Sequence, residues 1–388
     1  MLKGNMLIAH GGGPTPVINS SLLGAVREAK LHPEIETIYG ARYGAEGILA
    51  GDLMDLGQVD AENLALLAKT PASALGSCRR KLTDADYPAV LECFKRFNIR
   101  YFFYNGGNDS MDTCNKIYQL ATKSGYELRV IGIPKTIDND LAVTDHCPGF
   151  GSAAKYAAMS ALEIALDASA LPIHVVVMEL MGRNAGWITA ASALFADKMP
   201  CEHLVYLPEV AFDKAAFLAA VKEKFAKGKG LLVTISEGIH YADGSPVADS
   251  GVVDGFGHKV PGGAAQTLCD MIMAETGLKA RSEKPGLLGR VSVELMSPVD
   301  QREAEEAGAA AVRSAVEGKT GFMVGFQVDR VPAYACKTCL IPLEDVANAE
   351  KKFPLGWIGQ DGSSINEAFI DYCLPLLGEC DTRFAVIR

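Results

Sequence analysis

Short apolar runs alternate with helical stretches along the whole chain, and this alternation restricts the fold more than any other feature. NMLIAH leads through a glycine turn into a helical stretch that begins at about Val17. YFFYNGG leads into NDSMDTCNKIYQLATKSG, and RVIGIP, IHVVVMEL and GLLVTIS are further runs of the same kind. Short strands that are apolar on both faces and are joined by helices are typical of a parallel sheet with helices on both sides. We therefore predict an α/β fold.

The length of the chain indicates more than one core. At 388 residues the chain exceeds the usual size of a single hydrophobic core, so two domains are expected. No low-complexity linker and no repeat at a fixed period marks a boundary. We therefore expect the chain to cross between two lobes more than once.

Composition excludes several classes of protein. The net charge is −10 and no Lys/Arg cluster stands out, which argues against a nucleic-acid partner. The first apolar run is too short for a signal peptide, and no run approaches the ~18 apolar residues of a membrane span. Ten cysteines are scattered, and only Cys336 and Cys339 form a CxxC, without the second pair or nearby histidines that a zinc site needs. We expect reduced, structural cysteines and a cytoplasmic protein.

Polar motifs follow the apolar runs, and ligands of open parallel sheets bind beyond the carboxyl ends of the strands. HGGGPTPVIN contains Gly11, Gly12 and Gly13, whose backbone N–H groups could face a phosphate, although a simple tight turn has the same pattern. LGSCRRK presents arginines and a lysine that suit phosphate oxygens or form a solvated basic cluster.

GIPKTIDNDL is the most unusual of these motifs. Asp138 and Asp140 flank Asn139, and carboxylates this close need a compensating cation, proton or donor. One carboxylate could act as a general base towards a hydroxyl while the other holds Mg²⁺ or orients its partner. A helix N-cap would explain one aspartate but not the neighbouring Lys135.

Three further motifs offer groups for an anionic sugar. MGR contains Met181, Gly182 and Arg183, SEGI contains Glu237, and KARSEKPGLLGR contains Arg281 and Arg290. Each of these could instead form a surface salt bridge. The seven histidines follow no metal or triad pattern, and we interpret them mainly as structural.

Together these motifs resemble the phosphofructokinase family, and more closely its pyrophosphate-dependent branch. The order GGG, LGSCR, GGNDS, PKTIDND, MGRNAG, SEG and the arginine segment is kept from about Leu7 to Asp361. The resemblance implies two lobes, each a mostly parallel sheet flanked by helices, with the active site in the cleft between them. We expect residues 1–140 and about 250–300 to form the donor lobe. Residues 141–250 and about 301–388 would form the sugar-phosphate lobe and a C-terminal extension.

The resemblance implies transfer of a phosphoryl group to the 1-hydroxyl of fructose 6-phosphate, with Mg²⁺, in glycolysis and gluconeogenesis. Asp138 would be the base, with Asp140 assisting it. The sugar contacts would come from Thr136, Ile137, Met181, Gly182, Arg183 and Glu237, with Arg281 and Arg290 around the 6-phosphate. Gly12 would lie against the donor phosphate, and Arg79 would bridge the donor and acceptor phosphates.

Two positions indicate pyrophosphate as the donor. The ATP-using branch has glycine where Asp109 and Lys135 stand in this chain. The aspartate would fill the space of a third phosphate and repel it, and the lysine would stabilise the leaving phosphate. Two unit charges ~4 Å apart interact by about 4 kcal/mol at an effective dielectric of ~20.

Three residues depart from the family pattern. Asn108 stands where many relatives have the Mg²⁺-linked aspartate, so an amide oxygen or a bridging water would serve the metal. His174 replaces an arginine that reaches a neighbouring subunit's sugar phosphate, and Gly289 replaces a glutamine before Arg290.

The family also implies a homodimer or homotetramer. An ATP-dependent enzyme and a catalytically silent regulatory homologue are the alternatives.

Overall fold

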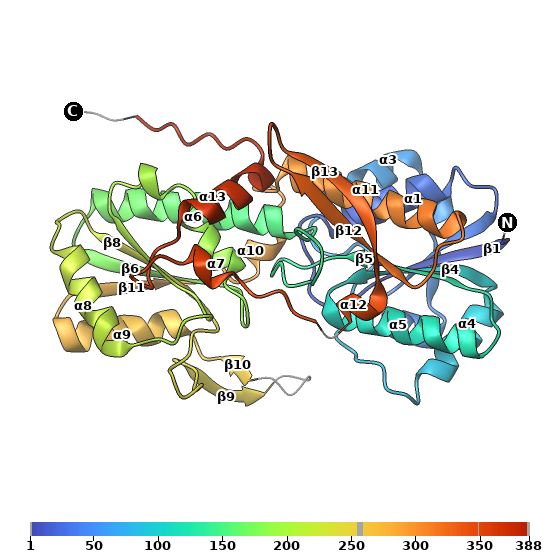
Figure 1. The fold of residues 1–388 in the computed structure, drawn as a ribbon, viewed down its shortest axis with the longest axis horizontal. Helices are drawn as coiled ribbons and strands as arrows, with labels where there is room; N and C mark the ends of the chain where they lie inside the picture. The colour runs from blue at the N-terminus through green and yellow to red at the C-terminus, as the bar shows by residue number, and fades with distance from the viewer. Residues whose placement is uncertain (1, 254–258, 348, 386–388) are drawn as a thin grey trace. The chain divides into compact units, whose positions relative to one another are not determined.

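The computed structural model describes residues 2–253, 259–347 and 349–385, and the chain divides into two compact units (Figure 1). The first unit is Met1–Phe150 with Arg290–Lys351, and the second is Gly151–Gly289 with Lys352–Arg388. The chain therefore passes between the units three times. Each unit contains a mainly parallel sheet flanked by helices, which confirms the predicted fold class.

The sheet of the first unit has seven strands in the order β13-β12-β5-β4-β1-β2-β3. Neighbouring strands from β12 to β2 are parallel, whereas β3 and β13 pair antiparallel at the two edges. The strands are β1 (Gly4–His10), β2 (Ile35–Ala41), β3 (Leu53–Asp55), β4 (Ile99–Gly106), β5 (Arg129–Pro134), β12 (Phe322–Asp329) and β13 (Ala335–Pro342).

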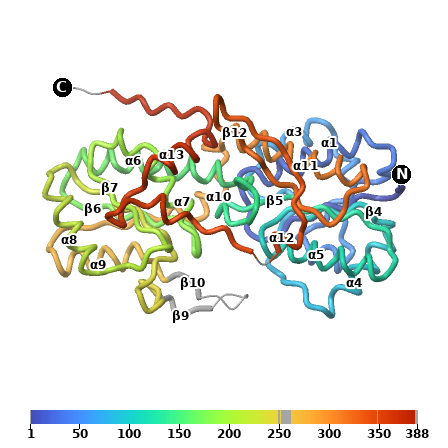
Figure 2. Tube along the Cα trace, viewed as in Figure 1, coloured from blue at the N-terminus to red at the C-terminus, as the bar shows by residue number. Residues whose placement is uncertain are grey.

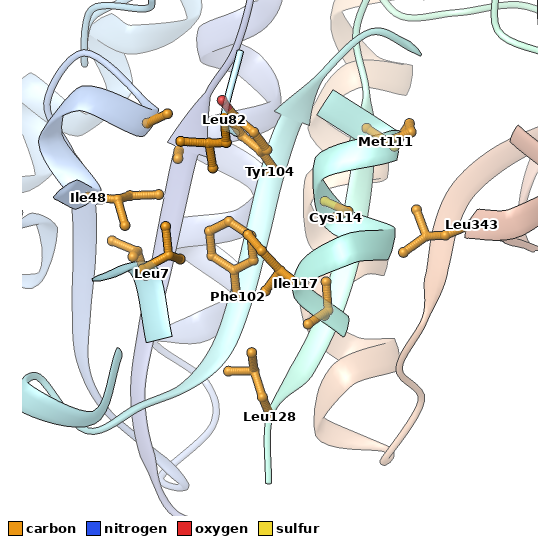
Figure 3. Close-up of a cluster of buried hydrophobic side chains, with 14 of the residues drawn as sticks. Leu7, Ile48, Leu82, Phe102, Tyr104, Met111, Cys114, Ile117, Leu128 and Leu343 are labelled. Atoms are coloured by element: carbon orange, nitrogen blue, oxygen red, sulfur yellow. The ribbon is translucent and has the colours of Figure 1, made fainter. Parts of the chain in front are cut away.

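Helices cover both faces of this sheet because its central strands are apolar on both sides. Leu7 and Phe102 pack in one buried cluster, while Met6 and Phe103, their neighbours in sequence, pack in another. Figure 3 shows the first cluster, where Phe102 lies near Ile117 of α5. The helices are α1 (Ile18–Ala29), α2 (Ala45–Ala50), α3 (Ala61–Leu66), α4 (Tyr87–Arg96), α5 (Asn108–Lys123), α11 (Pro298–Val316) and α12 (Leu343–Val346), with 3₁₀ turns at Leu56–Gln58 and Leu67–Lys69.

Helices α1 and α11 lie side by side although they are far apart in the sequence (Figure 1, Figure 2). Glycines allow this close approach. A Cβ atom on Gly24 would lie 1.9 Å from the backbone oxygen of Glu305, and one on Gly308 would lie 1.9 Å from that of Ser21. The contact joins the C-terminal part of the first unit to its N-terminal part.

The sheet of the second unit has four parallel strands in the order β11-β6-β8-β7. The strands are β6 (His174–Leu180), β7 (Glu202–Tyr206), β8 (Leu231–Ser236) and β11 (Lys279–Glu283), and a separate hairpin contains β9 (Asp249–Val253) and β10 (Lys259–Pro261). The helices are α6 (Phe150–Ala170), α7 (Trp187–Ala191), α8 (Lys214–Phe225), α9 (Ala264–Thr276) and α13 (Glu367–Cys373), with 3₁₀ turns at Ala196–Lys198, Leu355–Trp357 and Leu374–Leu377. The short helix α10 (Leu288–Val291) spans the boundary with the first unit.

The compact units differ from the expected lobes in three segments. Residues 250–289 belong to the second unit, because β11 pairs with β6 there. Residues 301–351 belong to the first unit, because β12 pairs with β5 and α11 packs on α1. The first boundary lies at residue 150 rather than 140.

Membrane insertion was not expected from the sequence. Within the part of the chain that the structure describes, no helix combines the length and the apolar character that crossing a bilayer requires.

Candidate active site

Three predicted motifs meet at the carboxyl ends of β1, β4 and β5 in the first unit. The Nζ atom of Lys135 donates a hydrogen bond to the backbone oxygen of Gly13 at 2.6 Å. A Cβ atom on Gly12 would lie 3.4 Å from this Nζ atom, and one on Gly13 would lie 2.9 Å from Nη1 of Arg290. The glycine turn therefore lets a lysine and an arginine approach bare backbone.

The Lys135 side chain is almost completely buried, with 4% of its surface exposed. Burial lowers its pKa to about 8, against the opposing charges of Asp138 and Asp140. The positive charges of Arg290 and Arg79 lower the pKa further. Three cations and two carboxylates therefore interact here, an arrangement that suits a polyanionic ligand with a reacting hydroxyl.

The expected use of the glycine N–H groups is wrong for two of the three residues. The N–H of Gly11 donates to the oxygen of Asn105 at 2.9 Å, and the N–H of Gly12 donates to the oxygen of Cys78 at 3.1 Å. These bonds tie the turn to β4 and to the segment that precedes Arg79. The turn thus contributes mainly by its lack of side chains.

The loop that contains both aspartates is held by the residue between them. Asn139 has a left-handed backbone with φ 53°, and its Oδ1 atom accepts hydrogen bonds from the N–H of Cys147 and from Nζ of Lys351. Asp138 is half-buried, and its N–H donates to Oγ1 of Thr136 at 3.0 Å. Sequence reasoning missed Lys351, which lies 212 residues beyond Asn139.

Asn108 and Asp140 form a second pair at the same edge. Nδ2 of Asn108 donates to Oδ2 of Asp140 at 3.0 Å. The Oδ1 atom of each residue is buried and has no hydrogen-bond partner among the residues that the structure describes. Burial raises the pKa of Asp140. Two buried oxygens without partners are a donor set that fits Mg²⁺.

Asp109 lies in the first turn of α5, and its electrostatic interaction with a nearby charge is weaker than the sequence suggested. Its side chain is 71% exposed, and its carboxylate lies 3.4 Å from Nζ of Lys81. In water the same pair of unit charges interacts by only about 1 kcal/mol, so the larger value expected from the sequence does not apply. Arg80 is partly exposed and pairs with Glu46 and Asp86, in line with the alternative of a solvated basic cluster.

The second unit has a pocket at the carboxyl ends of β6, β8 and β11, and Met181 and Glu237 line it. Ser236 donates to the oxygen of Gly182, and a Cβ atom on Gly238 would lie 1.8 Å from the oxygen of Arg183. Burial raises the pKa of Glu237, which the charges of Lys284 and Arg183 oppose. The MGR and SEG motifs therefore form one packed site.

An ion pair between a buried glutamate and a half-exposed lysine in this pocket was not predicted. Glu179 is 2% exposed, and its carboxylate accepts hydrogen bonds from Nζ of Lys284 at 2.5 Å and from the N–H of Ala265 at 2.9 Å. A lone glutamate in an apolar strand was the available signal, since a buried carboxylate needs a partner. Lys284 also directly follows β11, where ligand-binding groups are expected.

Two other predicted groups are not brought together within one unit. Arg290 belongs to the first unit and lies against Gly13, whereas Arg281 is exposed on β11 in the second unit. His174 begins β6, and Met181 follows the end of the same strand. His174 therefore lies at the opposite end of β6 from the pocket.

Comparison with known proteins identifies the family to which the chain belongs. The phosphofructokinase family model matches residues 5–315, a range that contains every predicted site residue. The chain belongs to the phosphofructokinase family.

Relatives from this family resemble the chain over nearly its whole length. The pyrophosphate–fructose 6-phosphate 1-phosphotransferase of Halomonas elongata is 42% identical, and the match covers 97% of this chain and 92% of the relative. The protein of the same name from Methylococcus capsulatus is 43% identical at the same coverage. The crystal structure of a pyrophosphate-dependent phosphofructokinase from Marinobacter aquaeolei has a TM-score of 0.89 and 36% identity, and covers 97% of this chain and 92% of its own. The predicted resemblance to the pyrophosphate-dependent branch is confirmed.

Proposed function

We propose that this chain is a pyrophosphate-dependent phosphofructokinase. It transfers a phosphoryl group from pyrophosphate to the 1-hydroxyl of fructose 6-phosphate, and gives fructose 1,6-bisphosphate and phosphate in a reversible reaction. The observation that carries this proposal is the buried Lys135, whose ammonium group lies against the Gly12–Gly13 turn. Relatives named for the same reaction support it.

Donor recognition is assigned to the first unit. Lys135 would neutralise charge on the leaving phosphate, and Arg79 would bridge the donor and acceptor phosphates, since phosphoryl transfer depends on positioning and on cations around the transferred group. Gly12 keeps side-chain atoms away from the donor. Because Asp109 is exposed and lies beside Lys81, we propose that it excludes a third phosphate mainly by occupying space. The position of Arg290 against Gly13 also favours a contact with phosphate.

Acceptor activation is assigned to Asp138, which would take the proton of the 1-hydroxyl as it attacks. Asp140 would support it, and Asn139 keeps the loop in place. Arg281 is assigned to the 6-phosphate, and the sugar contacts are assigned to Thr136, Ile137, Met181, Gly182, Arg183 and Glu237. His174 would serve a sugar phosphate only in a neighbouring subunit.

The residues present fit a magnesium ion. Asn108 and Asp140 would hold it through the two buried oxygens that lack partners among the described residues. When bound, Mg²⁺ would neutralise charge on the phosphate oxygens. Asn108 also fixes the orientation of Asp140 through its amide hydrogen bond.

The proposed assembly follows from the family resemblance, and the proposed location follows from the composition of the sequence. We propose a homodimer or homotetramer, in which a partner subunit completes the sugar-phosphate site. We also keep the prediction of a cytoplasmic location.

A coupled assay with fructose 6-phosphate and Mg²⁺ tests the proposal. We expect fructose 1,6-bisphosphate to form with pyrophosphate, and Asp138→Ala to abolish turnover while sugar binding is largely retained. Good turnover with ATP and none with pyrophosphate would assign the chain to the ATP-dependent branch. No turnover with either donor would indicate a silent homologue.

A further inference from the structure

His146, Glu303 and Cys336 lie together in the first unit although the sequence separates them widely. His146 belongs to the loop after β5, Glu303 to α11 and Cys336 to β13. One nitrogen, one carboxylate oxygen and one sulfur from these residues all lie within 4.8 Å of one another. In a tetrahedral zinc site such atoms are about 3.3–3.8 Å apart, so small side-chain shifts would complete the geometry.

The histidine is already oriented as metal-bound histidines are. Its Nδ1 atom lies 3.0 Å from the carboxylate of Asp145, and two nitrogens of Arg330 hold that carboxylate at 2.8 Å each. The ring of His146 stacks on Phe326, and its Nε2 atom points at Glu303, 2.8 Å from the carboxylate oxygen. A carboxylate on the remote nitrogen fixes the ring and raises its basicity as a ligand.

Glu303 is oriented by a neighbour, and both Glu303 and Cys336 are accessible. The hydroxyl of Tyr334 donates to Glu303 at 2.6 Å, which leaves the second carboxylate oxygen towards His146. Glu303, Tyr334 and Cys336 line a pocket of about 300 Å³, which provides an entry path and room for a fourth ligand such as water.

We propose that His146, Glu303 and Cys336 bind a zinc ion or a similar transition metal. Thiolate and imidazole ligands select zinc, whereas Mg²⁺ prefers oxygen ligands, so this site is distinct from the one at Asn108 and Asp140. The thiolate and the carboxylate balance the two charges of the ion, and Arg330 balances Asp145. The proposal does not rest on the proposed reaction.

The CxxC pattern hid this site in the sequence. Cys336 and Cys339 face opposite sides of the sheet and pack against different clusters, so they do not act as a pair. The histidine that a zinc site requires comes from 190 positions earlier in the chain. Without a metal, a protonated His146 between two carboxylates would keep the same contacts. Only a bond from the metal to the sulfur of Cys336 therefore distinguishes the metal-bound site from this ion-pair arrangement.

Cobalt is the probe for this site because it reports thiolate ligands by absorption. We expect the full chain to bind one Co²⁺ ion with a sulfur-to-metal band in the near ultraviolet, and Zn²⁺ to displace it. Cys336→Ser should remove the band and weaken binding at least about tenfold. Cys339→Ser, the matched control on the same strand, should leave the band and the affinity unchanged. Glu303→Gln should keep the band and weaken binding, because a neutral amide replaces the charged carboxylate ligand.

Absence of the sulfur band in the wild-type chain would overturn the proposal. Its persistence in Cys336→Ser, or its loss in Cys339→Ser, would do the same. Circular dichroism of each variant without metal checks that the fold is kept. If Cys336→Ser does not fold, an unchanged affinity for Co²⁺ in Glu303→Gln would overturn the proposal. Zn²⁺ should also raise the unfolding temperature of the wild-type chain by more than that of Cys336→Ser.

Discussion

Lys351, the last residue of the first unit in sequence, holds the loop that contains the proposed base Asp138. Its ammonium group donates to Oδ1 of Asn139 and to the backbone oxygens of Thr144 and Asp145, at 3.3, 3.3 and 2.8 Å. Its own N–H donates to the oxygen of Asp140 at 2.8 Å. All three donors of the ammonium group therefore act on one loop.

Lys351→Met should displace this loop, although Lys351 itself is assigned no contact with substrate. A misplacement of about 1 Å at a reacting group can cost about 100-fold in rate, so we expect kcat to fall by that order while the KM for pyrophosphate changes little. Steady-state kinetics check this, with the exposed Lys337→Met as the control. Unchanged kcat in Lys351→Met would show that the loop holds its position without the lysine.

The pKa of Lys135 predicts a pH dependence. With a pKa of about 8, the lysine is charged below pH 8 and loses its charge as the pH rises above 8. The value of kcat/KM for pyrophosphate, which reports the free enzyme, should therefore fall above pH 8. Lys135→Arg stays charged and should lack this decline, although its absolute activity will be lower. An identical decline in both proteins would assign the titration to another group.

Residues within a continuous motif could be predicted from the sequence, whereas their supports could not. Asp138, Asp140 and Lys135 are neighbours in one loop, and their unusual density of charge is visible in the sequence. The local sequence does not give the partners of Lys351 and Lys284, because only folding places them against Asn139 and Glu179. The ion pair of Asp109 also depends on the fold, because its partner Lys81 comes from another loop.

At the scale of elements, apolar patterning predicted the parallel strands and the helices on both sheet faces. Strands such as β4 are buried on both faces, and this signal is local. The edge strands β3 and β13 pair antiparallel, and because most of their residues are half-buried or exposed they lack this signal. The contact of α1 with α11 depends on two glycines far apart in the sequence, which no local pattern reveals.

Gly24→Ala tests this helix contact. The added methyl group would meet the backbone of α11 at 1.9 Å, so the helices must separate, and overpacking of this kind costs about 1–3 kcal/mol. We expect a lower unfolding temperature in a thermal melt. Gly356→Ala is the matched control, because no atom lies within 4 Å of its added methyl group. Equal losses in both variants would mean that the α1–α11 contact is not specifically tight.

At the scale of the whole molecule, the number of units and the repeated crossing could be predicted, but not the membership of every segment. The chain length indicated two cores, and the absence of a linker indicated several crossings. The affiliation of residues 301–351 depends on pairing of β12 with β5, a contact between distant strands. The proposed binding residues of each unit lie at the ends of strands. These strands are spread along the sequence, because the chain crosses between the units.

The ratio of kcat/KM for pyrophosphate to that for ATP tests the central claim most directly. With fructose 6-phosphate and Mg²⁺ saturating, we predict that pyrophosphate exceeds ATP by at least about 100-fold, and that Asp109→Gly with Lys135→Gly reduces this ratio. A wild-type ratio in favour of ATP would contradict the proposed function. An unchanged ratio in the double variant would contradict the assignment of donor choice to Asp109 and Lys135.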